Sequence, residues 1–368
     1  MQYRRMPIEI ESPEGYGYDR IECNLSESSF TDQRLDDLGI SLKKVLLFYG
    51  DHKGKAELRE ILAAEAKITK EDILITAGAA MALFIVASAL LEKGDPIVVA
   101  KSNYATNIET PRALGANICY LDLRFENGYK IDLEQLERSI TTQTKLVSLT
   151  YPHNPTGVTI DLATLEKIIT IIEEKNVFLL LDETYRDMNF NKPLPVAAGL
   201  SEKVISISSM SKSYGLPGIR TGWLMCRNRD LMEIFLAAKE QIIITNSVVD
   251  EEIAYQYLLN KERFFTPVKA TILRNFSIIK TFMEGQNLLE WVEPGGGCVC
   301  FPRIKESIPV NMERFHTLLL EKYATYVGRG HWFEEDDRYM RIGYSWEKPE
   351  KLQKGLSNIL KAIDESRL

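Results

Sequence analysis

The sequence predicts an α/β protein built as a large domain, with a mostly parallel central sheet flanked by helices, and a smaller α+β domain. Between about residues 70 and 226, short β-branched runs alternate with segments of helical period, as in a parallel sheet with helices on both faces. After about residue 245, a long charged helical stretch and a few short strands replace this pattern. We therefore expect residues 1–44 to pack with the small domain and the active site, residues 45–260 to form the large domain, and residues 261–368 to form the small one.

Seven strands are predicted in the large domain, each from a short apolar run: 73–76, 97–100, 118–121, 146–150, 177–181, 204–207 and 222–225. Residues 162–172, between two of these runs, place their apolar side chains on one helical face, and Asp161 is the predicted N-cap. This unit is a βαβ crossover. Ligands bind beyond the carboxyl ends of the strands in such sheets, so functional side chains are expected just after each run.

Composition restricts the class of partner. The net charge of −7 and the pI near 5.4 argue against nucleic acid, which requires clustered Lys and Arg. No apolar run reaches the roughly 18 residues of a membrane span, so no membrane partner is expected. The five cysteines are odd in number and scattered, which predicts reduced thiols in the cytoplasm. Cys298-x-Cys300 resembles half of a metal site, but no second pair follows it, so a strand is predicted there and no metal.

The segment from Ser206 to Trp223 sets Lys212 among small residues, with Arg220 eight positions later. A protonated lysine is a poor nucleophile, so an enzyme that uses one must lower its pKa or condense it with an aldehyde cofactor. Pyridoxal 5′-phosphate meets that need, with Ser209, Ser211 and Arg220 binding its phosphate. The alternative is a surface lysine near a turn.

Asp182 ends the most apolar of the predicted strands. A carboxylate beside so much hydrophobic surface is costly unless a cation or a donor meets it, and a protonated pyridine nitrogen is such a partner. Tyr185 follows three residues later, placed to donate to the phenolic oxygen of the same ring. The alternative is a helix N-cap with a packed tyrosine.

Two loops offer further contacts. In Tyr151-Pro-His-Asn-Pro-Thr-Gly157, the prolines and the glycine form a rigid turn that presents the Asn154 amide, while His153 is interpreted as a turn residue. Thr76-Ala-Gly-Ala-Ala80 leads from a strand into a helix. The backbone amides of Gly78, Ala79 and Ala80 therefore point toward an anion such as a phosphate.

These motifs, in this order, resemble the fold type I, class I/II PLP-dependent aminotransferases over nearly the whole chain. The resemblance implies that Tyr104 stacks on the cofactor ring and that Asn154 contacts its phenolic oxygen. It also implies that Arg341 binds the substrate α-carboxylate. Tyr49 matches a tyrosine that reaches the phosphate of the neighbouring subunit, which implies a homodimer. Ala80 departs from the family, where a hydroxyl residue is common.

The resemblance leaves open which reaction of this family the chain catalyses. In all of them an L-amino acid forms an external aldimine with the cofactor and loses its α-proton, with Lys212 as the base. The pieces around Asn154 and Lys212 look closest to the capreomycidine synthase branch, which dehydrates and cyclises a hydroxylated arginine to a cyclic guanidino amino acid. The alternative is an ordinary aminotransferase that uses a 2-oxo acid. An inactive PLP-binding regulatory protein is expected to have lost Lys212, Asp182 or Arg341, and all three are present.

A guanidinium substrate would favour acidic residues at the site. Glu9 is the first candidate and Glu11 and Glu27 follow, in a segment that commonly closes over substrate in relatives. The alternative is ordinary surface acid in an acidic protein. Arg329 stands out because it lies where relatives often carry a Pro-Gly turn.

Overall fold

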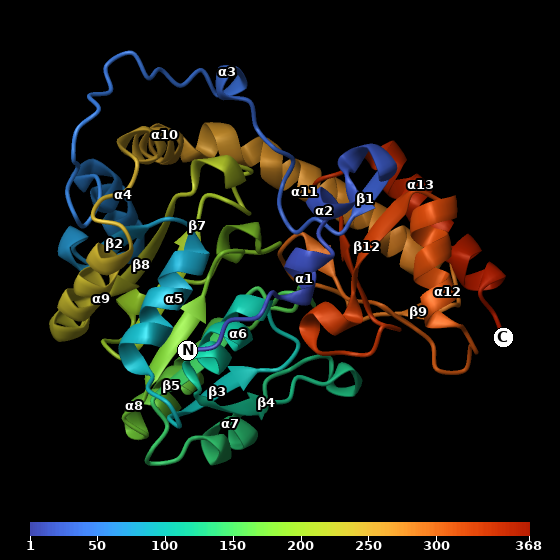
Figure 1. Cartoon of the computed structure of the whole chain (residues 1–368), viewed down its shortest axis with the longest axis horizontal. Helices are drawn as coiled ribbons and strands as arrows, with labels where there is room; N and C mark the ends of the chain where they lie inside the picture. Colours follow the sequence, from blue (N-terminus) through green and yellow to red (C-terminus); the bar gives the residue numbers. More distant parts are fainter.

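The computed structural model describes all residues, 1–368, and confirms the predicted fold class. A seven-stranded sheet forms the centre of the larger part (Figure 1). Its strands, in spatial order, are β2 (Ile73–Thr76), β8 (Gly222–Cys226), β7 (Val204–Ser209), β6 (Phe178–Asp182), β5 (Leu146–Thr150), β3 (Pro96–Ala100) and β4 (Asn117–Leu121).

All seven predicted runs are strands, with shifts of one or two residues at their ends. The strands from β7 to β4 pair in parallel, whereas β8 is antiparallel to both of its neighbours, β2 and β7. The expected crossover helix is α8 (Leu162–Glu174), and the Asp161 side chain accepts a hydrogen bond from the amide of Thr164 at 2.7 Å. The N-cap prediction is therefore confirmed.

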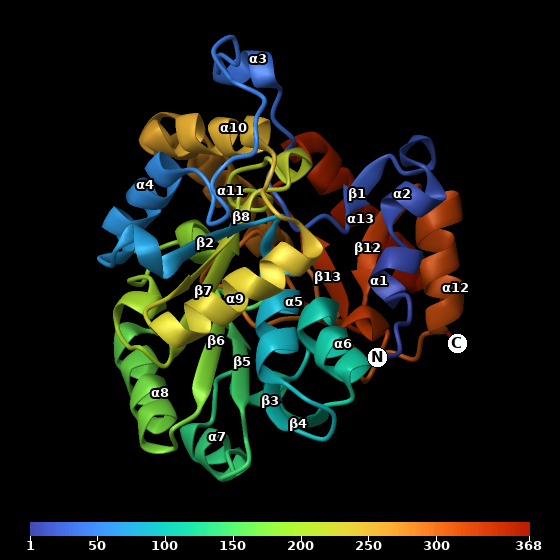
Figure 2. The same ribbon diagram turned by 60° about the vertical axis from the view of Figure 1, so that its left-hand side comes forward.

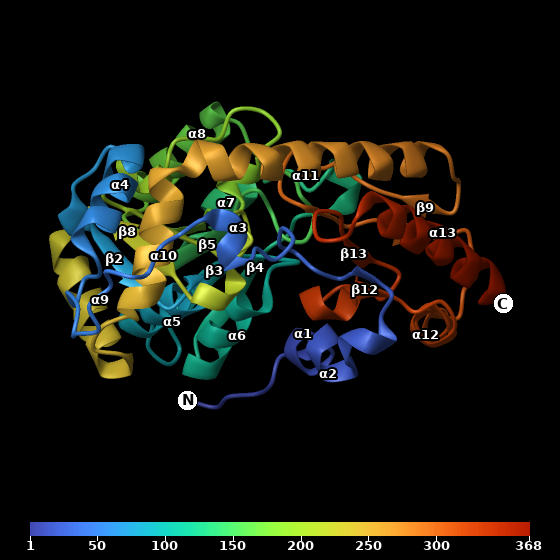
Figure 3. The same cartoon turned by 90° about the horizontal axis from the view of Figure 1, so that it is seen from above.

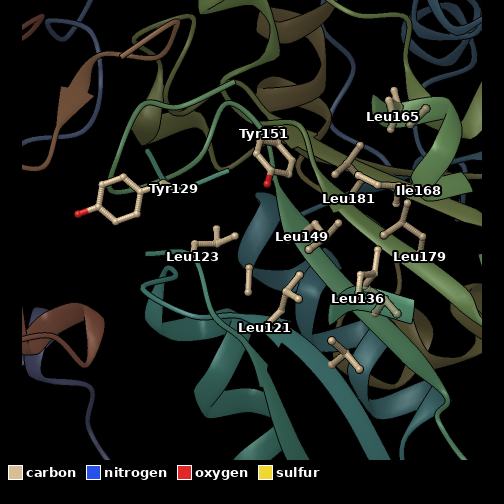
Figure 4. Close-up of a cluster of buried hydrophobic side chains, with 14 of the residues drawn as sticks. Leu121, Leu123, Tyr129, Leu136, Leu149, Tyr151, Leu165, Ile168, Leu179 and Leu181 are labelled. Atoms are coloured by element: carbon tan, nitrogen blue, oxygen red, sulfur yellow. The ribbon is translucent and has the colours of Figure 1, made fainter. Parts of the chain in front are cut away.

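Helices cover both faces of this sheet (Figure 2). On one face, α7 (Leu133–Ser139) and α8 pack against alternate strand residues, and this cluster includes Leu149, Leu179 and Leu181 (Figure 4). On the other face lie α5 (Ala79–Leu90), α6 (Ala105–Leu114) and α9 (Arg229–Ile242). Because both faces are buried, each strand reads as a continuous apolar run rather than an alternating one.

A second sheet organises the smaller part. Its order is β1 (Cys23–Leu25), β12 (Thr325–Arg329), β13 (Met340–Gly343) and β10 (Val299–Cys300), with β1 parallel to β12. β9 (Leu289–Glu290) and β11 (Arg303–Ile304) form a separate pair. The N-terminal chain thus joins a sheet made of C-terminal strands, and the predicted limits at residues 45 and 260 stay predictions.

The remaining helices frame these sheets. The long helix α11 (Lys261–Glu284) extends from the larger part across to the smaller one (Figure 3). Its apolar side chains share a core with α13 (Pro349–Glu365), β10 and β13. The other helices are α1 (Pro7–Ile10), α2 (Pro13–Tyr16), α3 (Leu35–Leu38), α4 (Ala56–Ala66), α10 (Val248–Leu259) and α12 (Met312–Thr317). None of the helices is long and apolar enough to cross a membrane.

Gly343, on β13, lets the backbone at Glu27 come closer than a residue with a side chain would permit. A Cβ atom there would lie 1.7 Å from the carbonyl oxygen of Glu27. We expect Gly343→Ala to lower the free energy of unfolding by about 1–3 kcal/mol, because the backbone must shift to relieve the overlap. Gly218→Ala is the matched control, since nothing lies within 4 Å of its added Cβ. Equal denaturant unfolding midpoints for the two variants would contradict the prediction.

Candidate active site

A cavity of about 250 Å³ opens where β5, β6 and β7 end, as the strand-end rule predicts. It gathers residues that are far apart in sequence, from the N-terminal helices to β13. Thirteen of the predicted residues line it: Glu9, Glu27, Ala79, Ala80, Tyr104, Asn154, Asp182, Tyr185, Ser209, Ser211, Lys212, Arg220 and Arg341. Gly78 and Tyr49 do not line it, although Gly78 lies against the guanidinium of Arg220.

Lys212 lies in the cavity wall, in the turn after β7. Its Nζ donates to the Ser28 hydroxyl at 3.2 Å. Burial lowers the pKa of Lys212, and the negative charge of Glu27 acts in the opposite direction. A lysine of this kind is closer to its neutral, nucleophilic form than a surface lysine is.

Asp182 is the last residue of β6 and is almost fully buried. One carboxylate oxygen, Oδ1, accepts from the backbone amide of Thr184 at 3.0 Å and from its hydroxyl at 2.6 Å. Burial raises the pKa of Asp182, although the two Thr184 donors and the charge of Lys212 oppose it. A cationic donor on the cavity side of this carboxylate would stabilise its charged form and lower its pKa again.

An anion cradle lies at the first turn of α5. Gly78 is its N-cap, with a φ of 81°, and a Cβ there would lie 2.5 Å from Nη2 of Arg220. A Cβ on Gly222 would lie 2.7 Å from the amide nitrogen of Ala79. Arg220 donates to the Ser211 hydroxyl at 3.1 Å. The helix N-terminus, the guanidinium and the hydroxyl thus converge, and glycines permit the approach.

Arg341, on β13, is buried at the other side of the cavity. It donates to the carbonyl oxygen of Ser26 at 2.7 Å and to Oδ1 of Asn154 at 3.3 Å. Its Nε is buried without a hydrogen-bond partner. A carboxylate bound by this fork would satisfy that donor.

Tyr104 and Tyr185 both line the cavity, and the hydroxyl of Tyr185 is already engaged. It donates to the carbonyl oxygen of Ser28 at 3.0 Å. A bond from Tyr185 to a ligand therefore requires that this contact be exchanged.

Besides Asp182, three glutamates line the cavity: Glu9, Glu14 and Glu27. Burial raises the pKa of Glu27, with Lys212 opposing. The structure corrects the expectation for Glu11, which does not line the cavity, because its carboxylate binds His331 and Trp332. Glu14, from the same acidic segment, lines the cavity instead, and it is not singled out by the sequence analysis.

Other residues noted in the sequence have structural roles. His153 is buried, its Nδ1 lies 2.9 Å from the Thr156 hydroxyl, and burial lowers its pKa to about 3, so it stays neutral. Arg329 pairs with Asp337. Tyr49 is the exception, because its side chain is 81% exposed and packs against nothing that would give it a structural role.

Sequence reasoning missed several cavity residues. Thr150 and Thr184 lie at or just beyond the ends of β5 and β6, so the strand-end rule contained the signal for both. Ser28 and Trp332 also line the cavity, but they carry no local signal, because tertiary packing alone brings their segments to the site.

The fold and the lysine-centred cavity define an α/β enzyme of the aminotransferase kind. The family model for aminotransferase class I and II matches residues 26–359. The chain belongs to this family, which confirms the predicted resemblance and the prediction of an enzyme.

Individual relatives differ in reaction. The chain is 28% identical over 323 residues to capreomycidine synthase from Streptomyces vinaceus, covering 86% of this chain and 81% of that protein. It is also 28% identical over 328 residues to an aspartate aminotransferase from Pyrococcus horikoshii, covering 86% and 83%.

Solved structures agree on the fold. A PLP-dependent aminotransferase from Streptococcus suis superposes with a TM-score of 0.91 at 26% identity, covering 100% of this chain and 99% of that one. The PLP-dependent cyclase OrfR also superposes with a TM-score of 0.91, at 23% identity, covering 99% and 98%.

Glu27 is expected to raise the pKa of Lys212 in the apoprotein. Glu27→Gln removes the opposing charge, so the pKa of Lys212 should fall further below its ordinary value. The pH dependence of Lys212 labelling by an amine-specific reagent, followed by peptide mass spectrometry, measures this shift. Glu22→Gln is the control, because Glu22 pairs with Lys354 away from the cavity. Identical labelling profiles for Glu27→Gln and the wild type would contradict the prediction.

Proposed function

We propose that this chain, a PLP-dependent enzyme of the aminotransferase family, acts at the Cα–H bond of an L-amino acid. We further propose that its substrate is a hydroxylated arginine, which it dehydrates and cyclises to a cyclic guanidino amino acid of the capreomycidine or enduracididine type. The observation that carries the specific proposal is the set of three carboxylates, Glu9, Glu14 and Glu27, in the wall of the cavity.

The residues present fit the cofactor. The cradle of Gly78, Ala79, Ser211 and Arg220 offers amide, hydroxyl and guanidinium donors to a phosphate. The buried carboxylate of Asp182 suits a protonated ring nitrogen. Ser209, Tyr104, Asn154 and Tyr185 complete the proposed contacts, and Ala80 contributes only backbone to the phosphate.

Pyridoxal phosphate, when bound, supplies an aldehyde that condenses with amines and a ring that accepts the electron pair released at Cα. Lys212 would hold the cofactor through its aldehyde and, when free, would take the proton from the substrate Cα. Asp182 would keep the ring nitrogen protonated. Arg341 binds the substrate α-carboxylate with a fork that includes its unpartnered Nε.

The carboxylates select the side chain of the substrate. Glu27 lies near the charges of Lys212 and Arg341, and Glu9 and Glu14 come from the N-terminal helices. A guanidinium placed among them gains charge-assisted hydrogen bonds that an apolar side chain cannot make. In the proposed reaction the Cα proton and the side-chain hydroxyl leave as water. A guanidino nitrogen then bonds to a carbon of the resulting unsaturated side chain and gives up its N–H proton, while a proton returns to Cα. The likeness to capreomycidine synthase supports this choice.

The alternative is an ordinary aminotransferase that transfers the amino group to a 2-oxo acid. The aspartate aminotransferase of Pyrococcus horikoshii supports it with the same identity, 28%. The same Lys212, Asp182 and Arg341 would serve both reactions, so the products must discriminate between them.

We also propose a homodimer in which Tyr49 reaches the cofactor phosphate of the partner. Segment 34–50 arches away from the body beside α10 (Figures 1 and 2). Four consecutive side chains in it are strongly exposed: Leu46, Leu47, Phe48 and Tyr49. Exposed apolar runs of this kind favour an interface. The chain after Tyr49 is anchored, because the buried Lys239 binds the carbonyl oxygen of His52 at 2.5 Å.

A cytoplasmic location is part of the proposal. All five cysteines are free, and four of them are buried. Unpaired thiols are typical of a reducing compartment.

A product assay tests the reaction. Purified enzyme loaded with PLP is mixed with hydroxyarginine, without any keto acid, and cofactor spectrum and product mass are recorded. We expect retained PLP and a product lighter by one water. Pyridoxamine phosphate with an oxo-acid product would establish the aminotransferase instead. Lys212→Ala is the control and should lower turnover by roughly a thousandfold or more, because it removes both the imine and the base.

Tyr49→Phe tests the shared site. We expect the variant to bind PLP about tenfold more weakly, because a charge-assisted hydrogen bond to phosphate is lost. Mixed dimers with Lys212→Ala should restore wild-type affinity in the site that keeps Lys212, since the Lys212→Ala subunit supplies Tyr49. Tyr3→Phe, also strongly exposed, is the control. If equilibrium titration with PLP gives the same affinity for both phenylalanine variants, Tyr49 has no such role.

A further inference from the structure

The N-terminal helices form part of the cavity wall but make few side-chain hydrogen bonds to the rest of the protein. Residues 6–17, here called the N-terminal cover, contain α1 and α2. Ile8, Glu9, Ser12, Pro13 and Glu14 of the cover line the cavity. The cover lies between α6 and the second sheet (Figures 1 and 2). Whatever holds the cover in place therefore determines whether Glu9 and Glu14 face the substrate.

Glu11 provides the polar anchor of the cover. Its Oε2 accepts from the indole Nε1 of Trp332 at 2.7 Å and lies 3.0 Å from Nε2 of His331. Its carbonyl oxygen accepts from the Tyr326 hydroxyl at 2.6 Å. Trp332 itself lines the cavity, so the anchor and the substrate site share a residue.

His331 lies between two carboxylates. Its Nε2 faces Glu11, and its Nδ1 lies 2.8 Å from Oδ1 of Asp337. A neutral imidazole has one N–H donor, so it can satisfy only one of these carboxylates. An imidazolium donates to both. The geometry of the anchor is therefore complete only when His331 is protonated.

We propose that His331 and Trp332 are positioning residues that clamp Glu11, closing the N-terminal cover over the substrate when His331 is protonated and releasing it when His331 is neutral. The clamp exists because this chain has Gly330-His-Trp-Phe333 after Arg329. The effect of the clamp on substrate binding acts through Glu9 and Glu14, so this effect rests on the proposed function. The movement of the cover does not depend on which substrate is bound.

The charged surroundings of His331 come from three further elements. Asp337 follows η8 (Gly330–Phe333), Glu11 is the C-cap of α1, and Arg329 ends β12. His316 on α12 is also near, but burial lowers its pKa to about 4, so it stays neutral. The hydrogen bond to Asp337 raises the pKa of His331, with burial and Arg329 opposing.

The sign of the pH effect follows. A histidine whose pKa is raised in the folded state contributes its full stabilisation below its ordinary pKa of about 6.5. The contribution is lost as pH rises through the raised pKa. The cover is thus closed in mildly acidic solution and opens on the alkaline side.

Hydrogen exchange of residues 6–17 in the PLP-loaded enzyme tests the clamp without any substrate. After correction for intrinsic rates, we expect exchange in the wild type to be about tenfold faster above the raised pKa than at about pH 6. His331→Gln and Glu11→Gln should exchange fast at both pH values. Trp332→Phe keeps an aromatic ring but lacks the indole N–H that Glu11 accepts from, so it should exchange faster than the wild type at the lower pH. His331→Arg, which keeps the cation, should exchange slowly at both.

Glu22→Gln is the matched control, because the pair of Glu22 with Lys354 lies just after the cover and away from the cavity. It should leave exchange unchanged. Exchange in the wild type that is independent of pH, or His331→Gln that matches the wild type, overturns the proposal.

Kinetics provide the second readout. With the substrate established by the product assay, His331→Gln should raise KM about tenfold at the lower pH and change kcat less than about twofold, since the cover binds substrate and leaves Lys212 in place. His331→Arg should restore the low KM and abolish its pH dependence. An equal fall of kcat in both His331 variants would contradict a positioning role. If the exchange pattern holds and hydroxyarginine is not a substrate, the clamp stands and the proposed function fails.

Discussion

The site depends on one stretch of backbone, residues 26–30, that lies between the two sheets. The carbonyl oxygen of Ser26 accepts from Arg341. The carbonyl oxygen of Ser28 accepts from Tyr185, and the Ser28 hydroxyl accepts from Lys212. Side chains from the large sheet and from the second sheet thus bind the same short segment. Arg341 and Tyr185 are buried and Lys212 is half-buried, so losing the segment would leave these donors unsatisfied, and their positions are coupled for that reason.

The segment also explains why charge can be concentrated in so small a cavity. Lys212 and Arg341 bring two cations, and Glu27 and Asp182 bring two carboxylates. The segment accepts from both cations, through the Ser28 hydroxyl for Lys212 and the Ser26 carbonyl oxygen for Arg341. Burial moves the pKa of Lys212 down and that of Asp182 up, so both groups move toward neutrality. Cofactor and substrate charges act on these same groups, which makes the protonation states of the site dependent on what is bound.

Local sequence patterns predicted much of the fold and of the cavity lining. The strands were readable because buried parallel strands are continuous apolar runs, and Lys212, Asp182 and Asn154 were readable because each belongs to a motif at the end of a strand. The antiparallel direction of β8 was not readable, since pairing is decided by long-range topology. The engagement of the Tyr185 hydroxyl with Ser28 joins residues 157 positions apart, and no spacing in the sequence encodes it.

The roles of the N-terminal glutamates could not be predicted from local sequence patterns. Glu9 and Glu11 are two residues apart and look equivalent in the sequence, yet a helix turns about 200° over two residues, so they point in different directions. Glu9 lines the cavity, whereas Glu11 meets His331 and Trp332. The partners that distinguish them, His331 and Trp332, lie more than three hundred residues later in the chain. A substitution at His331 therefore acts on the same wall of the cavity as a substitution at Glu9, through the backbone of one helix.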